Sequence, residues 1–260
     1  MESLIEAYLS GNEKQLRQLV LSGADINLPM REYPGDILLE PCLAKNIRLV
    51  NFLLIHGAWP TGKLLSDLIG YSGVLPVRYL ARLLRRLLKA GADPNAKERG
   101  HTLLWWAAES GDSRTRDNAR LASVLLQFGA DPNMRAAPNM KNTPCKDDYN
   151  PQETPLLRAA YCNQTAMLIK LLKYGADINT VDNYGRNALF YASMGMGRLP
   201  VYKCLVRHRI DLQHRLPDGT SITDYMRNLS PFVSGQAEAY LMACGAPRPT
   251  IPRAKLRPNL

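Results

Sequence analysis

The sequence predicts an all-α solenoid of stacked helix-turn-helix units, with short turns projecting as fingers between the units. Two observations predict it: a phrase built on Gly-Ala-Asp recurs along the chain, and each copy closes a segment of helical apolar spacing, such as Leu168, Leu171 and Leu172. One unit of this size has too little core to be stable alone, so neighbouring copies must bury one another's faces. We expect six or seven units over residues 1–249.

The recurring phrase marks the end of each unit. From its glycine in one copy to the next, the spacing is 34, 34, 38, 46, 34 and 36 residues, with Arg209 in place of glycine in the sixth copy. Glycine ends a helix in the left-handed conformation without a steric penalty, and aspartate satisfies backbone N–H groups in the following turn. The phrase therefore predicts a helix stop and a turn, at residues 22–27, 56–60, 90–95, 128–133, 174–179, 208–212 and 244–247.

A second, shorter helical segment lies between these stops. It is rich in small residues, as at 105–108, 157–160 and 190–193. Alanines at matching places let two helices approach closely, so each unit is predicted to be a turn followed by a helical hairpin.

Together these features resemble the ankyrin repeat family, whose units carry the phrase Thr-Pro-Leu-His-x-Ala after a turn that contains glycine. Residues 100–108, 154–160 and 182–189 match that phrase best, and residues 219–224 resemble the altered form of a last repeat. The resemblance covers residues 1–249. It implies an ankyrin-repeat solenoid with short β-turn fingers that acts as a protein-binding module.

The repeat pattern has several irregularities. Residues 1–27 form a polar N-terminal cap, and the third unit, 61–95, has no recognisable Thr-Pro-Leu phrase. The fourth unit has extra residues near 112–118, and an insertion at 134–151 falls where the finger between the fourth and fifth units belongs. Because loops of that length in compact repeats are often functional, this finger is where we expect a binding site. Residues 250–260 form a basic, proline-rich tail, for which a docking motif and a solubilising end are equally good interpretations.

Composition excludes several classes of protein. No stretch approaches the roughly 18 apolar residues that a membrane span needs, and Glu2 and Glu6 stand where a secretory leader would be basic and then apolar. We expect a soluble, cytoplasmic protein that is monomeric on its own. The odd number of widely spaced cysteines predicts reduced thiols with no metal site, and Cys145 in the insertion is the thiol expected to be exposed.

The formal charge of +10 is unevenly placed. It is −2 over residues 1–60, +4 over 61–133, +2 over 134–179 and +6 over 180–260. This distribution favours a protein partner with an acidic surface, or nucleic acid as the second choice.

Candidate partner-binding residues follow from the resemblance, since ankyrin repeats contact partners with finger tips and the exposed side of each first helix. A mixed aromatic and charged strip of this kind is what the core of an interface prefers, although the same residues can simply be solvated. Carried over by position, the candidates are Lys97, Glu98, Arg99, His101, Trp105, Glu109, Ser110, Asn150, Glu153, Tyr161, Asn183, Tyr184, Arg186 and Met194.

The adjacent Trp105 and Trp106 point about 100° apart on a helix, so we expect one to be more exposed than the other. Packing between repeats is the main interpretation for both, and a partner-facing anchor is the alternative for one.

The segment 77–90 is the most polarised in the chain, and we expect it to form a long second helix. Its basic residues, among them Arg78, Arg82 and Arg85, follow one face, and its leucines follow the opposite face. The main interpretation is the outer helix of a repeat, with leucines inward and charges outward. Binding of a phosphate backbone, an anionic membrane surface or an acidic protein is the alternative.

The residue pattern gives no support for an enzyme. It contains no nucleophile with a neighbouring base, no paired carboxylates and no metal-ligand spacing, and Gly195-Met196-Gly197 lacks the third glycine of a nucleotide loop. His56 and His208 precede helix stops and are best interpreted as capping or packing residues. We expect no catalytic residue and no cofactor.

The leading hypothesis is therefore a non-enzymatic protein-binding adaptor, inhibitor or neutraliser, which recognises one partner through its fingers and concave inner helices. The alternative is binding of nucleic acid or an anionic surface through the basic C-terminal two-thirds of the chain.

Overall fold

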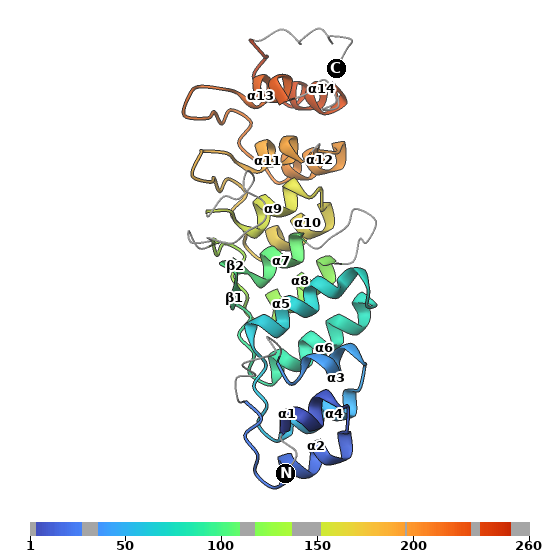
Figure 1. The fold of residues 1–260 in the computed structure, drawn as a ribbon. Helices are drawn as coiled ribbons and strands as arrows, with labels where there is room; N and C mark the ends of the chain where they lie inside the picture. Colours follow the sequence, from blue (N-terminus) through green and yellow to red (C-terminus); the bar gives the residue numbers. More distant parts are fainter. Residues whose placement is uncertain are drawn as a thin grey trace, which may run out of the picture.

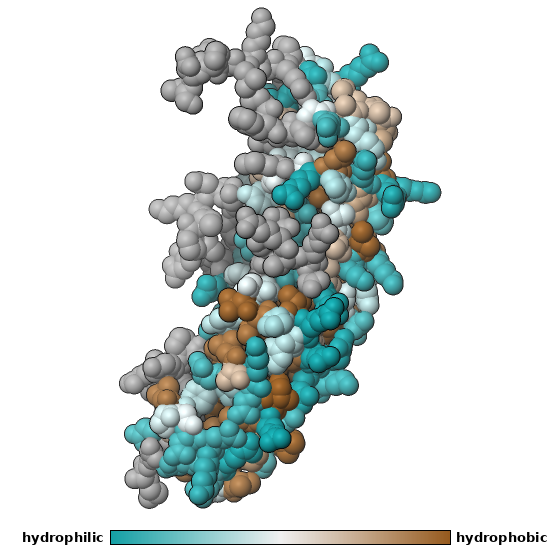
Figure 2. All heavy atoms as spheres, turned by 90° about the vertical axis from the view of Figure 1, so that its right-hand side faces the viewer, coloured by the Kyte–Doolittle hydropathy of each residue, from teal (hydrophilic) through white to brown (hydrophobic). Residues whose placement is uncertain are grey.

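The computed structural model describes residues 4–27, 36–109, 118–136, 152–195, 197–229 and 235–250. Within these ranges, seven consecutive pairs of helices stack in one row, with the two ends of the chain at opposite ends of the stack (Figure 1). The predicted all-α solenoid is thus confirmed, with seven units. Seen from the side in Figure 2, the row is bowed.

Each unit contributes a first helix and a second helix. The first helices are α1 (Leu4–Leu9), α3 (Leu39–Leu43), α5 (Gly62–Gly70), α7 (Leu103–Glu109), α9 (Pro155–Tyr161), α11 (Ala188–Met194) and α13 (Ile222–Leu229). The second helices are α2 (Glu13–Leu21), α4 (Ile47–Ile55), α6 (Val77–Lys89), α8 (Asn118–Gln127), α10 (Thr165–Lys173), α12 (Leu199–Arg207) and α14 (Gly235–Ala243). A 3₁₀ turn, η1 (Tyr71–Gly73), follows α5, and two short strands, β1 (Lys97–Glu98) and β2 (His101–Thr102), precede α7.

The repeated phrase ends the second helices as predicted. Its glycines have positive φ, for example 94° at Gly57 and 88° at Gly175, and Arg209 adopts 64° at the same place in the sixth unit. In the turn that follows, each aspartate accepts a hydrogen bond from the N–H two residues on, as Asp177 does from Asn179 at 2.9 Å. The aspartates are therefore turn formers.

Asparagines of the same phrase tie four of these turns to the next one. Asn133 Nδ2 donates to the Gly175 carbonyl at 2.9 Å, and its Oδ1 accepts from the Asp177 N–H at 2.8 Å. Asn27 makes the same pair of bonds to Gly57 and Trp59. These bonds satisfy backbone groups that the helix ends leave open, and they fix the spacing of the units.

The small residues of the first helices form the contacts between units. Alanines in α7, α9 and α11 are fully buried, and these three helices pack in sequence against one another. Gly195 and Gly197 belong to this packing: a Cβ on Gly195 would lie 1.8 Å from the Tyr161 carbonyl oxygen, and one on Gly197 would lie 2.6 Å from that of Ala192. Both glycines are thus required for close packing of the helices.

Helix α6 has 13 residues, which confirms the predicted long second helix of the third unit. Its leucines at 80, 83, 84, 87 and 88 are buried, and its basic residues are exposed. This is the outer helix of a repeat.

The insertion at 134–151 lies mostly outside the described residues, but its two ends are placed. The Ala136 N–H donates to the Glu153 carbonyl at 3.1 Å, which closes the base of the insertion. Arg135 bonds to the carbonyls of Gln152 and Val181, at 3.2 and 2.9 Å, and so joins this base to the next finger.

The cysteines within the described ranges are free thiols: Cys42 and Cys204 are buried, Cys162 is half-buried and Cys244 is exposed. The expectation that Cys145 is the only exposed thiol is therefore wrong, because Cys244, directly after the last helix α14, is exposed. Cys145 itself lies outside the described residues. Across the described parts of the chain, no helix is both long enough and apolar enough to span a bilayer.

Candidate functional site

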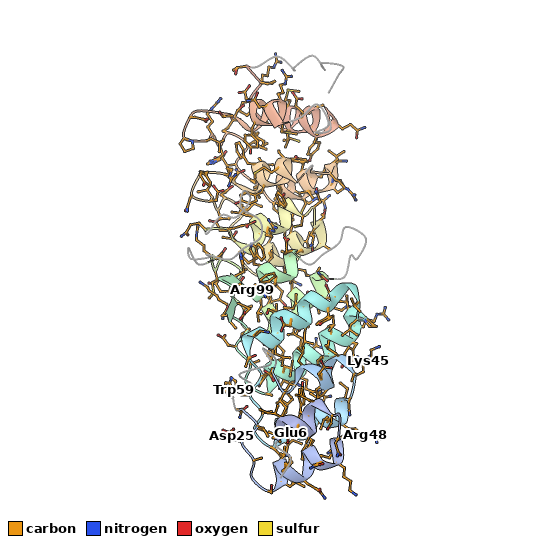
Figure 3. All side chains as sticks on the ribbon, in the orientation of Figure 1. Glu6, Asp25, Lys45, Arg48, Trp59 and Arg99 are labelled. Atoms are coloured by element: carbon orange, nitrogen blue, oxygen red, sulfur yellow. The ribbon has the colours of Figure 1, made fainter. Side chains whose placement is uncertain are left out.

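The finger of the fourth unit is a tight hairpin formed by β1 and β2. Arg99 and Gly100 both have positive φ, 50° and 79°, which gives the turn the twist that a two-residue hairpin needs. Lys97 and Arg99 project into solvent, whereas Glu98 is half-buried. Figure 3 shows Arg99 on the face of the stack turned toward the viewer. Two of the candidate charges are thus available to a partner.

Three other candidates are not available to a partner. His101, Trp105 and Glu153 are 2%, 6% and 1% exposed, so the prediction that their side chains face a partner does not fit this conformation. The reason is that they pack against each other: the His101 ring stacks on Trp105 with centroids 3.7 Å apart, and Trp105 Nε1 donates to Glu153 Oε2 at 3.1 Å. Trp106 is half-buried and donates to the Glu98 carbonyl, which confirms that the two tryptophans differ in exposure.

Arg158 on α9 connects this cluster to the surface. Its guanidinium pairs with Glu109 of α7, lies 3.8 Å from Glu153 Oε1, and is 4.8 Å from the ring centroids of both Trp105 and Tyr161. Glu153 Oε1 has no hydrogen-bond partner among the described residues. Because one cation contacts groups on two consecutive units, Arg158 holds the fourth and fifth units in a fixed relation.

Burial sets the protonation of the cluster. It raises the pKa of Glu153 to about 7, even though Arg158 and the bond from Trp105 favour the charged form. Burial, with Arg158 acting in the same direction, lowers the pKa of His101 to about 4. His101 is therefore neutral at physiological pH, while Glu153 titrates there.

Arg186 makes a similar set of contacts within the sixth unit. Its Nε is 2.7 Å from Oδ2 of the buried Asp182, and its guanidinium lies 4.7 Å from the ring of Tyr184 and 5.3 Å from that of Tyr191. Tyr191 also donates to Asp182 Oδ2 at 3.1 Å. Tyr184 is 63% exposed, so one face of its ring is held by Arg186 and much of the rest meets solvent.

The remaining candidates fall into three groups. Asn183 is exposed beside Tyr184, and Glu109, Tyr161 and Met194 are half-buried like Arg186. Ser110 and Asn150 lie outside the described residues.

Two hollows on the N-terminal units are lined mostly by residues outside the candidate set, which contributes only Glu98 and Arg99 to them. The first, of about 600 Å³, is lined by α1, α2, α3 and α4 with Lys63 of α5, and the second, of about 510 Å³, by residues of α3, α5, η1, β1 and α7. Both include Leu39 and Lys63, so they adjoin along the first helices of the stack. The sequence signal beside them is the polar cap of the first unit and the absent Thr-Pro-Leu phrase of the third, which by themselves indicate only an irregular repeat.

Comparison with known proteins places this geometry in a family. Residues 77–179 and 136–215 match the family model described as ankyrin repeats (three copies), and these overlapping segments cover more than half of the chain. The chain belongs to the ankyrin repeat family. Ankyrin repeats are generally protein–protein interaction modules, and their domains are typically non-enzymatic.

Among solved structures, the human ASB11 ankyrin repeat domain has a similar fold. The TM-score is 0.64 at 19% sequence identity, and the match covers 94% of this ankyrin repeat chain and 98% of that one. No curated protein matches the sequence.

One contact of this ankyrin repeat protein resembles a catalytic pair but is not arranged as one. Cys204 Sγ lies 3.8 Å from His208 Nδ1, yet the same nitrogen is 2.8 Å from the Cys204 carbonyl oxygen and donates to it. Burial raises the pKa of the Cys204 thiol, which disfavours the thiolate that a nucleophile requires. His208 is thus the capping residue that its position predicts. Within the described ranges, no group of three His, Cys, Asp or Glu side chains could hold a metal ion.

Proposed function

We propose that this protein is a non-enzymatic binding module that recognises a specific protein partner through the fingers and first helices of its fourth to sixth units. The observation that carries the proposal is Tyr184, an exposed aromatic ring whose position is fixed by Arg186 and, through it, by the buried Asp182. A rigid aromatic side chain loses little conformational entropy on binding, which is why such residues dominate interface energies.

The neighbouring residues fit the same role. Lys97 and Arg99 project from the finger of the fourth unit, and Asn183 from that of the sixth, so polar groups flank the aromatic residues on this face. A partner surface with acidic groups complements the two cations. An adaptor, an inhibitor and a neutraliser would all use this surface in the same way.

The test is affinity purification from the native host with mass spectrometry, using the full chain as bait. Tyr184→Ala is expected to lower recovery of the partner at least tenfold. Tyr174→Ala is the matched control, since Tyr174 is also exposed but caps the outer helix α10. Equal recovery by both variants would contradict the proposal. Arg186 is unsuitable for this test, because its loss would leave the buried Asp182 without its cation.

A second candidate function rests on the exposed face of α6. Arg78, Arg82, Arg85 and Lys89 are all exposed and form no ion pair with a described residue, so this helix carries a stripe of free positive charge. Binding of nucleic acid to such a stripe weakens steeply with salt. A mobility-shift titration at low salt, in which Arg82→Ala with Arg85→Ala removes retention, would support it; no retention of duplex or single-stranded probes by the unmodified chain would eliminate it.

A further inference from the structure

The two adjoining hollows of the N-terminal units form one groove across four units, which we call the N-terminal groove. It is lined by the first helices α1, α3 and α5, by residues of α2 and α4 at one end, and by the finger and Trp106 of the fourth unit at the other. Three apolar side chains on its lining are exposed: Leu9, Tyr71 and Val74, the last at 79%.

The charges of the groove are mostly negative in a protein of net charge +10. Its lining includes the carboxylates Glu13, Glu40, Asp67 and Glu98 but only the cations Lys63 and Arg99. Glu13 pairs with Arg17 at 2.7 Å and Asp67 with Lys63 at 3.1 Å. Glu40 and Glu98 form no ion pair with a described residue, so two carboxylates and Arg99 remain for an occupant.

The backbone of the groove restricts the shape of that occupant. The groove is lined chiefly by α-helices, whose N–H and C=O groups are used within the helices, and β1 offers only two residues. An extended peptide would therefore leave its own backbone groups unpaired on an apolar floor, whereas an α-helix satisfies them internally. A helix with side chains is about 10–12 Å wide.

The spacing of the units fits a helix as well. Packed helices lie about 8–10 Å apart, and seven residues of an α-helix rise about 10.5 Å. Apolar side chains repeated every seven residues would thus meet one unit after another, beside Leu9, then Leu39, then Tyr71 and Val74.

We propose that the N-terminal groove binds an amphipathic α-helix of a partner protein, with an apolar seam of seven-residue repeat that is flanked by lysine and arginine. The apolar seam covers Leu9, Leu39, Tyr71 and Val74, and the flanking cations meet Glu40 and Glu98. Figure 3 shows the open face of these units between Asp25 and Trp59 at the finger edge and Lys45 and Arg48 at the opposite edge. This site adjoins the one proposed on units four to six at the finger of the fourth unit, where both include Arg99, and does not include Tyr184.

The probe for the test is a designed, fluorescein-labelled peptide of 18 residues, with leucine at the first and fourth positions of each heptad and lysine beside them. A second peptide carries glutamate in place of lysine. A third has the lysine sequence with two central prolines, which prevent a helix. Fluorescence anisotropy with the full chain is expected to give an affinity at least tenfold higher for the lysine helix than for either of the other two.

Matched variants locate the binding. Leu9→Ser with Val74→Ser is expected to weaken the lysine helix at least tenfold. The control, Leu21→Ser with Ile55→Ser, removes equally exposed aliphatic side chains from the ends of the outer helices α2 and α4 and should change affinity less than twofold. Equal loss in both pairs would show nonspecific adsorption and overturn the proposal.

Charge is tested in the same way. Glu40→Gln is expected to weaken binding of the lysine helix about threefold, and Gln127→Lys on α8, which changes the net charge equally, should not. Tyr184→Ala should leave the affinity for the lysine helix unchanged. A failure of the lysine helix to bind can therefore be told apart from a failure of the function proposed for units four to six, which is tested by recovery of the partner. Equal affinity for the lysine and glutamate helices would overturn the proposal. So would a lack of binding of the lysine helix when the protein is in 100-fold excess over the labelled peptide.

Discussion

The first three units and the fourth to sixth units are built from the same helical hairpin, but the space beside their first helices is filled differently. In the fourth to sixth units, Arg158 and Arg186 occupy it, each between aromatic rings and paired with carboxylates. In the first three units, Arg17 pairs with Glu13 and lies over the Phe52 ring, and Lys63 pairs with Asp67. No described cation there lies between two aromatic rings, and hollows lined by Leu9, Tyr71 and Val74 remain.

This difference separates two ways of binding. A filled, cross-linked surface offers fixed groups to a partner of matching shape, which limits the entropy lost on association. A hollow lined by apolar side chains instead takes side chains from the partner and gains from the area that they bury. Variants that change one region and spare the other can therefore test whether the two regions differ in this way.

The largest effect is expected from Arg158→Ala. The variant leaves Glu109 and the buried Glu153 without their cation and removes the stack between Trp105 and Tyr161, so the free energy of unfolding should fall by about 3–5 kcal/mol at pH 8. Urea denaturation followed by circular dichroism measures it. Arg82→Ala, on the exposed face of α6, should change stability by less than about 0.5 kcal/mol. A similar small change for Arg158→Ala would mean that the central units are not held by this cation.

The next effect depends on pH and comes from Glu153. Its pKa in the folded protein, about 7, lies above the usual 4.5, so the stability that the protonated carboxyl contributes is complete below pH 4.5 and is lost as the pH rises through 7. The free energy of unfolding of Glu153→Gln, measured relative to that of the unmodified protein, should therefore rise by roughly 3 kcal/mol as the pH increases from 4.5 to 8.

His101 provides the comparison for that profile, because its shift has the opposite consequence. Burial lowers its pKa to about 4, so the neutral ring contributes stability that is present above pH 6.5 and is lost as the pH falls toward 4. His101→Gln should thus be less stable than the unmodified protein above pH 6.5 but no longer less stable near pH 4. At that low pH, Glu153→Gln should be no more stable than the unmodified protein. Parallel pH profiles for the two variants would contradict these assignments.

A smaller effect is expected where the two regions are alike, in the asparagines that join successive turns. Asn133→Ala and Asn27→Ala each remove the same two bonds, one to the carbonyl and one from an N–H of the next turn, and each should cost about 1–2 kcal/mol in urea denaturation. A much larger cost at Asn133 would mean that the turns, and not Arg158, hold the central units together.

The repeat architecture could be predicted because it depends on local signals that recur. Glycine at a left-handed helix end, aspartate in the turn and buried alanines in the first helices each have one dominant structural reason, and their recurrence along the chain makes the signals reinforce one another. The long α6 and the role of its leucines followed from periodicity in the same way.

The site could be predicted only in part, because position in a repeat does not decide whether a side chain is covered. Glu153 and His101 hold finger positions that face partners in the family, but Trp105 and Arg158 of this chain cover them. The burial of Glu153 depends on its contact with Trp105, about 50 positions away, which no periodic pattern reveals. The hollows lie beside the irregular N-terminal units, and an irregular repeat pattern does not show what space lies beside its helices.

The smallest effects are expected at the non-glycine residues with positive φ, which occur in both regions. Lys45 follows α3 with φ of 58°, where the first unit has Gly11, and Arg209 ends α12 with φ of 64°, where the other units have glycine. A Cβ makes this conformation costly, so Lys45→Gly and Arg209→Gly should each stabilise the protein by about 0.5–1 kcal/mol, after the larger entropy of glycine in the unfolded chain is taken into account.

Asn163 has φ of 57° but also donates to the Gly195 carbonyl and accepts from the Arg198 N–H. Asn163→Gly should therefore destabilise, since it loses both bonds. Urea denaturation could show that Arg209→Gly stabilises the protein and Lys45→Gly does not. The first units would then unfold separately from the rest, because a measured unfolding transition reports only on the free energy of the cooperative unit that unfolds in it.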